Sequence, residues 1–341
     1  MLLPQGIEKH KNLSTSFTRF DHLLQDLFEN RFSGYLKLNF WGFEGVLVFD
    51  TGRMIEGYTS EQDVYLTGEP AVLKVLEKGV EPEGTLEVYD LASEIALALG
   101  YALQATLYKD ENDLGNYALT HVFEMLENEG LTGYVDLQFS GKRGNGTVYF
   151  LEGTSVEAVI MSGTGRIASG EQVFNKFLEI GELIQPRVKA YQVLNPTSIN
   201  EDESFVIPWI HKPFVHFWGE ILQLLRGIMD DYFKKNKFYP LLEKVCNDNT
   251  DHYPFLDPRK GIVRLSPEGF DITRIIHYPT FVQGMIIVLN KAFLQVPPRP
   301  FKKLDVALVA AEVGKMAEKV DLNRPGFDPH KTVMQIFRGF A

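Results

Sequence analysis

Hydrophobic residues near positions 20 and 120 recur at intervals of three and four, which predicts an amphipathic helix at each place. Runs of β-forming residues separated by glycines follow each helix and predict a β-hairpin and a third strand. A second helix, over residues 69–78 or 171–180, and a last strand complete the pattern, so the order αβββαβ is predicted twice. The apolar helical positions are Phe20, Leu23, Leu24 and Leu27 in the first copy and Leu119, Val122, Phe123 and Leu126 in the second.

The two copies also match each other residue by residue. Three stretches align with their glycines in register: 33–40 with 132–139, 45–52 with 146–153, and 68–77 with 170–179. The offset drifts only from 99 to 102, so the match needs few insertions. We therefore predict a tandem repeat, with Gly52 and Gly153 in turns at positive φ. The pairs expected to superpose are Gly34 with Gly133, Gly52 with Gly153, and Glu69 with Glu171.

The predicted fold class is α+β, with two tandem αβββαβ domains whose sheets are mainly antiparallel and a mostly helical C-terminal domain. The first domain is assigned to residues 1–108 and the second to 109–196. A helix over residues 92–107 has no counterpart after the second repeat, and we expect it to pack between the repeats. The polar, acidic stretches at 109–116 and 197–204 are interpreted as linkers.

Residues 205–341 show helical periodicity and no similarity to the repeats. A long amphipathic helix is predicted over 214–232, further helices over 280–294 and 303–320, and short strands at 262–265 and 270–273. The apolar face of the first helix is the candidate interaction surface. Two interpretations stay open, because this face could be buried within its own domain or could in part contact a second copy of the chain. The interaction candidates are Phe217, Trp218, Ile221, Leu225 and Ile228.

Charge is unevenly distributed along the 341 residues, whose formal net charge is −11. Residues 1–204 hold 15 Lys and Arg against 31 Asp and Glu, a net of −16, whereas residues 205–341 hold 19 against 14, a net of +5. The acidic front repels phosphate backbones, so nucleic-acid binding is not expected. The single cysteine, the absence of a signal-peptide pattern and the absence of a long apolar run favour a cytoplasmic protein without membrane insertion.

Loops and histidines supply few candidates for chemistry. Gly163, Thr164 and Gly165, with Gly170, could suggest a phosphate loop, but the Gly-Lys-Ser/Thr ending is missing and a flexible loop is favoured. Residues 247–251 are rich in oxygen donors but lack the central Gly and closing Glu of a calcium loop, so a solvated loop is favoured. His211 and His216 are five residues apart rather than four, which favours surface or capping roles over a metal pair.

Nucleophiles and carboxylates are equally sparse. Cys246 would need a histidine base, and His252 is near it only in sequence, so a buried cysteine is the favoured interpretation. Glu56 aligns with Glu157, and Glu69 aligns with Glu171. Because these carboxylates recur at the same place in each repeat, we expect them to serve the fold, with the second pair complementing the helix dipole. No catalytic residue, cofactor site or metal site is predicted.

The repeated unit resembles the PATAN-type domain of bacterial signalling proteins. The resemblance covers about residues 15–195 and is carried by a Ser/Thr-Gly-x-Leu/Val-x-Leu strand, a Gly-x-Val/Leu-x-Phe-x-x-Gly hairpin and a Gly-Glu-x-x-x-x-Lys-x-Leu-Glu helix. It implies a bacterial, non-catalytic regulatory or protein-interaction module, of a kind found in regulators of surface motility and pili. The chain departs from those regulators because its sequence contains no receiver domain.

These observations predict a regulatory or scaffold protein that is not an enzyme and that binds other proteins of a signalling pathway, with possible self-association through the C-terminal domain. Two alternatives are kept: a small-molecule sensor with a pocket between the repeats, and an enzyme assembled across the repeat interface. A deep pocket with clustered His, Asp or Glu whose pKa values are perturbed would favour an enzyme, whereas a flat apolar patch would favour a scaffold.

Overall fold

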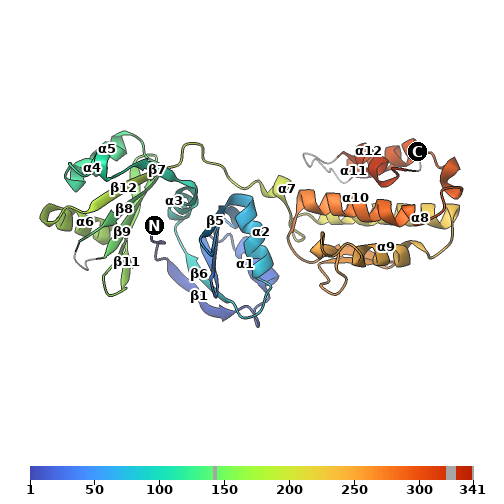
Figure 1. Cartoon of the computed structure of the whole chain (residues 1–341), viewed down its shortest axis with the longest axis horizontal. Coiled ribbons are helices and arrows are strands. Elements are labelled where there is room, and N and C mark those ends of the chain that lie inside the picture. Colours follow the sequence, from blue (N-terminus) through green and yellow to red (C-terminus); the bar gives the residue numbers. More distant parts are fainter. Residues whose placement is uncertain (141–143, 320–327, 340–341) are drawn as a thin grey trace. The chain divides into compact units, whose positions relative to one another are not determined.

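The computed structural model describes residues 1–140, 144–319 and 328–339, and the chain divides into two compact units, Met1–Ile199 and Asn200–Ala341. The first unit holds both repeats and the second is mainly helical, so the predicted α+β class is confirmed (Figure 1).

The first repeat forms a six-stranded antiparallel sheet in the order β1-β6-β2-β3-β4-β5, and hydrophobic residues of α1 and α2 are buried against it. Tight turns at Gly42 and Gly52 join consecutive strands, and Gly52 has a φ of 87°. A side chain at Gly52 would collide with the Phe28 carbonyl, so both backbone and space require glycine here. The elements are β1 (Ile7–Ser14), α1 (Phe20–Glu29), β2 (Gly34–Phe40), β3 (Phe43–Asp50), β4 (Arg53–Glu61), β5 (Val64–Thr67), α2 (Gly68–Lys78) and β6 (Thr85–Asp90).

The second repeat has the same topology, with the order β11-β10-β9-β8-β12-β7. Gly34 and Gly133 both open a strand, Gly153 has a φ of 85° in the turn equivalent to that of Gly52, and Glu69 and Glu171 both lie in the first turn of a helix. The predicted repeat and its two glycine turns are thus confirmed. The elements are β7 (Thr106–Lys109), α4 (Glu111–Leu114), α5 (Leu119–Asn128), β8 (Gly133–Gln138), β9 (Asn145–Leu151), β10 (Thr154–Met161), β11 (Ile167–Ser169), α6 (Glu171–Leu183) and β12 (Arg187–Gln192).

Each repeat contains two strands more than the sequence predicted, one at each edge of its sheet. The order is βαββββαβ in the first repeat and βααββββαβ in the second, which also contains α4. β1 and β7 precede the first helix of each repeat, and β5 and β11 precede the last helix. Residues 106–108, assigned to the first domain from the sequence, pair with β12 and belong to the second sheet. Residues 109–116 are not an open linker, since they include α4, which Asp110 caps through its side chain. Edge strands bury little on either face and therefore lack the alternation that reveals inner strands.

Helix α3 (Ser93–Gln104) lies between the two sheets, as predicted (Figure 1). Its buried Leu99 and its alanines pack with Tyr35 and Val48 of the first sheet and Tyr149 of the second in one hydrophobic cluster. The segment before β1 also contacts both sheets. Tyr35 of the first sheet donates a hydrogen bond to the Pro4 carbonyl, and Tyr149 of the second donates one to the Leu2 carbonyl. The two repeats therefore share a core.

The second unit is built around α8 (Lys212–Tyr232) and α10 (Tyr278–Leu294), which agree with the predicted helices at 214–232 and 280–294. The predicted strands at 262–265 and 270–273 correspond to the hairpin of β14 (Val263–Ser266) and β15 (Gly269–Ile272). The predicted linker at 197–204 spans the boundary between the units and ends in a helical turn. The remaining elements are α7 (Glu201–Ser204), β13 (Phe205–Val206), α9 (Phe238–Asn247), η1 (Pro254–Leu256), β16 (Ile276–His277), η2 (Pro300–Lys303), α11 (Val306–Lys319) and α12 (Pro329–Ile336).

The helix predicted over 303–320 corresponds to α11, which begins three residues later at Val306, and residue 320 lies outside the described residues. Among the helices that the structure describes, none is both long and apolar enough to cross a membrane.

Candidate functional site

The face of α8 predicted to mediate interaction is buried in its own unit. Phe217 and Trp218 have no exposed surface, and the Trp218 ring meets that of Phe281 edge-on at 5.4 Å between centroids. Residues of α9, α10 and α11 complete the same core. Of the two interpretations left open, burial within its own domain is the one that the structure shows, and the interpretation of this face as an exposed contact surface is corrected. The five residues concerned are Phe217, Trp218, Ile221, Leu225 and Ile228, all buried.

The two histidines have separate structural positions. His211 precedes α8, and its Nδ1 atom accepts a hydrogen bond from the Ile207 amide at 2.9 Å. His216 is exposed on α8, with Nε2 3.8 Å from the Glu220 carboxylate. Within residues 1–140, 144–319 and 328–339, no group of three or more His, Cys, Asp or Glu side chains could hold a metal ion.

Cys246 is buried in the core of the second unit, whereas His252 is exposed. Burial raises the pKa of the Cys246 thiol to about 12, with a smaller contribution from Glu243. The thiol is therefore protonated at neutral pH, which suits a core residue and not a nucleophile.

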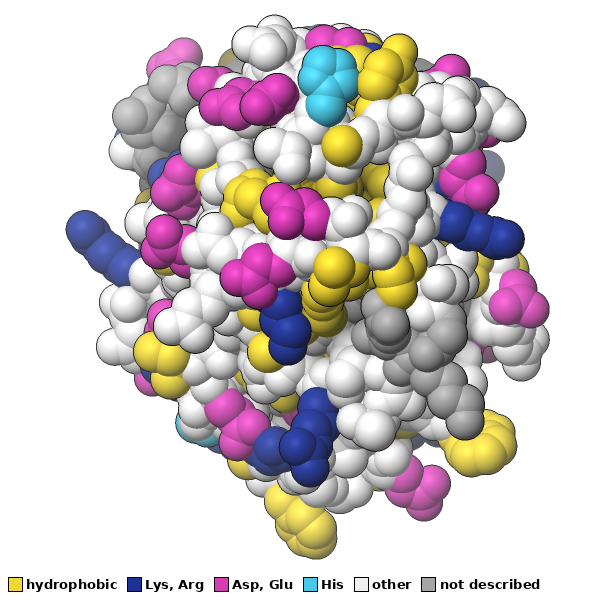
Figure 2. Space-filling model, turned by 90° about the vertical axis from the view of Figure 1, so that its left-hand side faces the viewer, with side chains coloured by type: hydrophobic (Ala, Val, Ile, Leu, Met, Phe, Trp, Pro, Cys, Tyr) yellow, Lys and Arg dark blue, Asp and Glu magenta, His cyan; other side chains and the backbone are white. Residues whose placement is uncertain are grey.

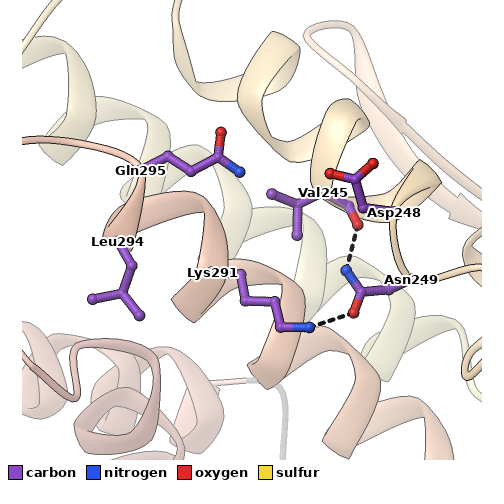
Figure 3. Close-up of a pocket in the computed structure, with 6 residues that line it drawn as sticks. All are labelled: Val245, Asp248, Asn249, Lys291, Leu294 and Gln295. Carbon is purple, nitrogen blue, oxygen red and sulfur yellow. Dashed lines mark hydrogen bonds between the residues drawn. The ribbon is translucent and has the colours of Figure 1, made fainter.

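The stretch 247–251 is not the wholly solvated loop that the sequence favoured. Asn249 is buried; it donates a hydrogen bond to the Val245 carbonyl and accepts one from Lys291 Nζ of α10 (Figure 3). These side chains border a shallow hollow of about 350 Å³, together with Asp248, Leu294 and Gln295. The amide of Asn249 thus ties the end of α9 to α10, and the contacts serve packing.

The aligned carboxylates Glu56 and Glu157 perform the same structural task. Glu56 Oε1 accepts hydrogen bonds from the amides of Gly57 and Gly68, and Glu157 Oε1 accepts them from the amides of Ala158 and Gly170. Gly68 and Gly170 begin the second helix of each repeat, so each carboxylate satisfies a free N–H group at a helix N-terminus. The expectation that these residues serve the fold is confirmed.

The candidate phosphate loop is the turn of a hairpin. Residues 162–166 join β10 to β11, where the Gly165 amide bonds to the Ser162 carbonyl and the Ser162 amide bonds to the Arg166 carbonyl. Gly170 lies beyond β11, at the start of α6, so the glycines of the motif do not form one cradle. Helix α3 packs between the repeats, and a cavity of about 410 Å³ is lined by residues of β8, β9 and β12 together with Met1 and Leu2 of the segment before β1.

The most exposed aromatic side chains lie at one end of the first sheet. Strand register places Ser14, Thr85 and Asn39 in one row across the sheet, so the loops beyond them lie together. These loops expose Phe17 at 93% and Trp41, at the tip of the β2–β3 hairpin, completely. Val80 is exposed in the third loop, and we call these three residues the loop-end patch.

The second repeat exposes apolar residues at the equivalent end. Tyr117 and Leu183 are both exposed there, and Gln185 holds the Tyr117 loop by donating a hydrogen bond to the Tyr117 carbonyl at 3.0 Å. On the face of the first unit drawn in Figure 2, hydrophobic side chains lie in small groups among charged ones.

Strand β5 forms a second exposed apolar feature. All four of its residues are exposed, and three of them, Val64, Tyr65 and Leu66, are apolar. Neither this strand nor the loop-end patch was predicted from the sequence. The signals were Trp41-Gly42 between two β-forming runs, and the Val-Tyr-Leu run just before the second helix.

A groove of about 620 Å³ lies on the second unit between α8, α11 and β15. Its lining is partly apolar, with Phe270 and Met316, and also includes the carboxylates of Glu220 and Glu312. Comparisons with protein-family models, with curated proteins and with solved structures found no match for this chain.

Proposed function

We propose that this protein is a non-catalytic regulatory or scaffold protein of a bacterial signalling pathway, acting in the cytoplasm by binding another protein through the loop-end patch of the first repeat. The observation that carries the proposal is the complete exposure of Trp41 on a hairpin tip, with Phe17 beyond the same end of the sheet. Tryptophan is among the residues that contribute most to binding when a partner covers them.

Other features support this function over the alternatives. The carboxylates that recur in the repeats accept backbone hydrogen bonds at helix starts, and Cys246 is a protonated core thiol. The resemblance to PATAN-type domains points to signalling, including control of surface motility or pili. The net charge of −16 over residues 1–204 favours a partner with a basic surface.

The test is site-specific photocrosslinking in the native host. A benzophenone amino acid at Trp41 is expected to capture one discrete partner, whereas the same probe at Leu194, an exposed residue after β12, is expected to capture none. Equal capture at both positions would contradict the proposal.

Once that partner is purified, Trp41→Ala is expected to weaken its binding by about thirtyfold, the equivalent of a ~2 kcal/mol hot spot. Circular dichroism and the melting temperature should stay unchanged, because the Trp41 side chain packs on nothing in this chain. An unchanged dissociation constant would remove the loop-end patch from the interface.

A further inference from the structure

We propose that β5 is a docking edge to which a partner adds one β-strand, and that this strand alternates apolar and basic residues. This surface is distinct from the loop-end patch, so it extends the proposed function without depending on Trp41. The proposal rests on the backbone geometry of β5, on its side chains and on the charges at its two ends.

The backbone of β5 has hydrogen-bonding groups directed away from the sheet. Gln62 and Asp63 have φ values of 48° and 66°, which is the two-residue type I′ turn, and they join Glu61 to its partner Val64. The residues that flank such a turn exchange both of their hydrogen bonds, and bonded and non-bonded pairs then alternate. Val64 and Leu66 therefore bond to β4, and the N–H and C=O groups of Tyr65 point outward together with the N–H group of Thr67. The Thr67 carbonyl belongs to α2, because Thr67 is the N-cap of that helix.

The side chains of β5 do not protect this edge. Proteins commonly guard an edge strand with charged residues or proline, because an open apolar edge invites pairing with another chain. The opposite edge of the same sheet follows this rule, since β1 carries Lys9, His10 and Lys11. In contrast, β5 presents Val64, Tyr65 and Leu66 without a charge or a proline. The ring of Tyr65 stacks on that of Tyr58 of β4, with 6.3 Å between the ring centroids.

The charged residues near β5 indicate which kind of strand would bind to its edge. Asp63 lies in the turn before β5 and Glu69 in the first turn of α2 after it, so an acidic residue lies close in sequence to each end of the edge. Antiparallel addition of a second copy would bring the end of β5 preceded by Asp63 in each copy toward the end followed by Glu69 in the other. Repulsion between the acidic residues at both ends disfavours self-association here. A strand with Lys or Arg beside its apolar residues would instead meet a carboxylate at each end.

A capped ten-residue peptide in which Val alternates with Lys is the probe, used at concentrations where it is monomeric. Titrated into the full-length ¹⁵N-labelled protein, it is expected to shift the amide resonances of Tyr65 and Thr67 most strongly. Two control peptides separate the causes: one is N-methylated at alternate amides, and the other has Glu in place of Lys. Both are expected to bind about tenfold more weakly or not at all.

Tyr65→Pro removes one outward N–H group, while the bonds of Val64 and Leu66 to β4 remain. The substitution is therefore expected to lower the affinity for the Val–Lys peptide by about tenfold. Trp41→Ala is expected to leave this affinity unchanged, which separates a failure here from a failure of the loop-end patch. The proposal is overturned if the N-methylated peptide or the Glu peptide binds as tightly as the Val–Lys peptide, or if the Val–Lys peptide does not bind. It is also overturned if light scattering shows a dimer that Tyr65→Pro abolishes. The peptide comparison uses wild-type protein, so it holds even if Tyr65→Pro does not fold.

Discussion

Glu56 and Glu157 show how one side chain can determine where a helix begins. Each lies on the strand that precedes the short edge strand, and each accepts the N–H group of the glycine that opens the following helix. In the first repeat, Gln104 of α3 donates a third hydrogen bond, to Glu56 Oε2 at 2.6 Å. Glu56 is therefore buried, whereas Glu157 is only half-buried. The same sequence position has acquired a different environment in each repeat.

Burial raises the pKa of Glu56, and the hydrogen bonds from Gly57, Gly68 and Gln104 offset only part of this shift. The folded protein therefore keeps the Glu56 proton to higher pH than the unfolded chain does. It follows that the free energy of unfolding falls as pH rises from about 4.5 through the raised pKa.

We expect Glu56→Gln to remove this dependence, so that chemical denaturation between pH 4.5 and 8 shows the variant gaining relative to wild type as pH rises. Glu157→Gln is the matched control, because it changes the equivalent helix-start bond at a half-buried position. Parallel curves for wild type and Glu56→Gln would show that Glu56 titrates alike in the folded and unfolded states.

At the scale of elements, the long amphipathic helices were located well and the edge strands were missed. Helix α8 spans Lys212–Tyr232 against a predicted 214–232, since its apolar residues recur along one face over its whole length. The strands β5 and β11 are four and three residues long and exposed on most positions, so they have no apolar periodicity to detect. Their pairing with β4 and β10 alone defines them.

Trp218 on α8 provides a test of the core of the second unit. Because its side chain is wholly buried among Phe214, Phe281 and the rest of the core, Trp218→Ala is expected to lower the free energy of unfolding by roughly 3–5 kcal/mol. Denaturant unfolding of the full chain, followed by hydrogen exchange in α8 and α10, measures this loss.

Light scattering should give the same mass for the folded Trp218→Ala variant as for wild type. A variant of wild-type stability that scatters as half the wild-type mass would instead show that this face contacts a second chain.

At the scale of the molecule, α3 joins the two repeats into one unit. Helix α3 follows the last strand of the first repeat, and no equivalent helix follows the last strand of the second repeat among the described residues. The buried residues of α3 contact both sheets. Its C-terminal residue Gln104 also bonds to the backbone of Thr197, so the segment leaving the second repeat is tied to the first.

Leu99 is a wholly buried residue of this shared core. Leu99→Ala is expected to cost about 2–5 kcal/mol and to increase hydrogen exchange in both sheets together. Leu194→Ala, at an exposed position, is expected to change stability by no more than ~0.5 kcal/mol. Faster exchange confined to the first sheet in Leu99→Ala would mean that the repeats do not depend on a shared core.

The sequence by itself determined the repeat, its glycine turns, the major helices and the structural role of the recurring glutamates. These features are local or periodic: a positive φ at Gly52 and Gly153 needs only a turn, and an amphipathic helix needs only one apolar face. Because such signals are carried by neighbouring residues, they can be found without knowing what lies across the core.

Tertiary structure alone decided which apolar residues are surface and which are core. The face of α8 that suggested an interaction surface is covered by α9, α10 and α11, while Trp41, Phe17 and β5 remain exposed. The residues of the α8 face and the exposed residues are all apolar, so their side-chain type does not distinguish them. Long-range packing does, because burial depends on neighbours far away in sequence. For the same reason Asn249, in a stretch that reads as a solvated loop, is buried against Lys291.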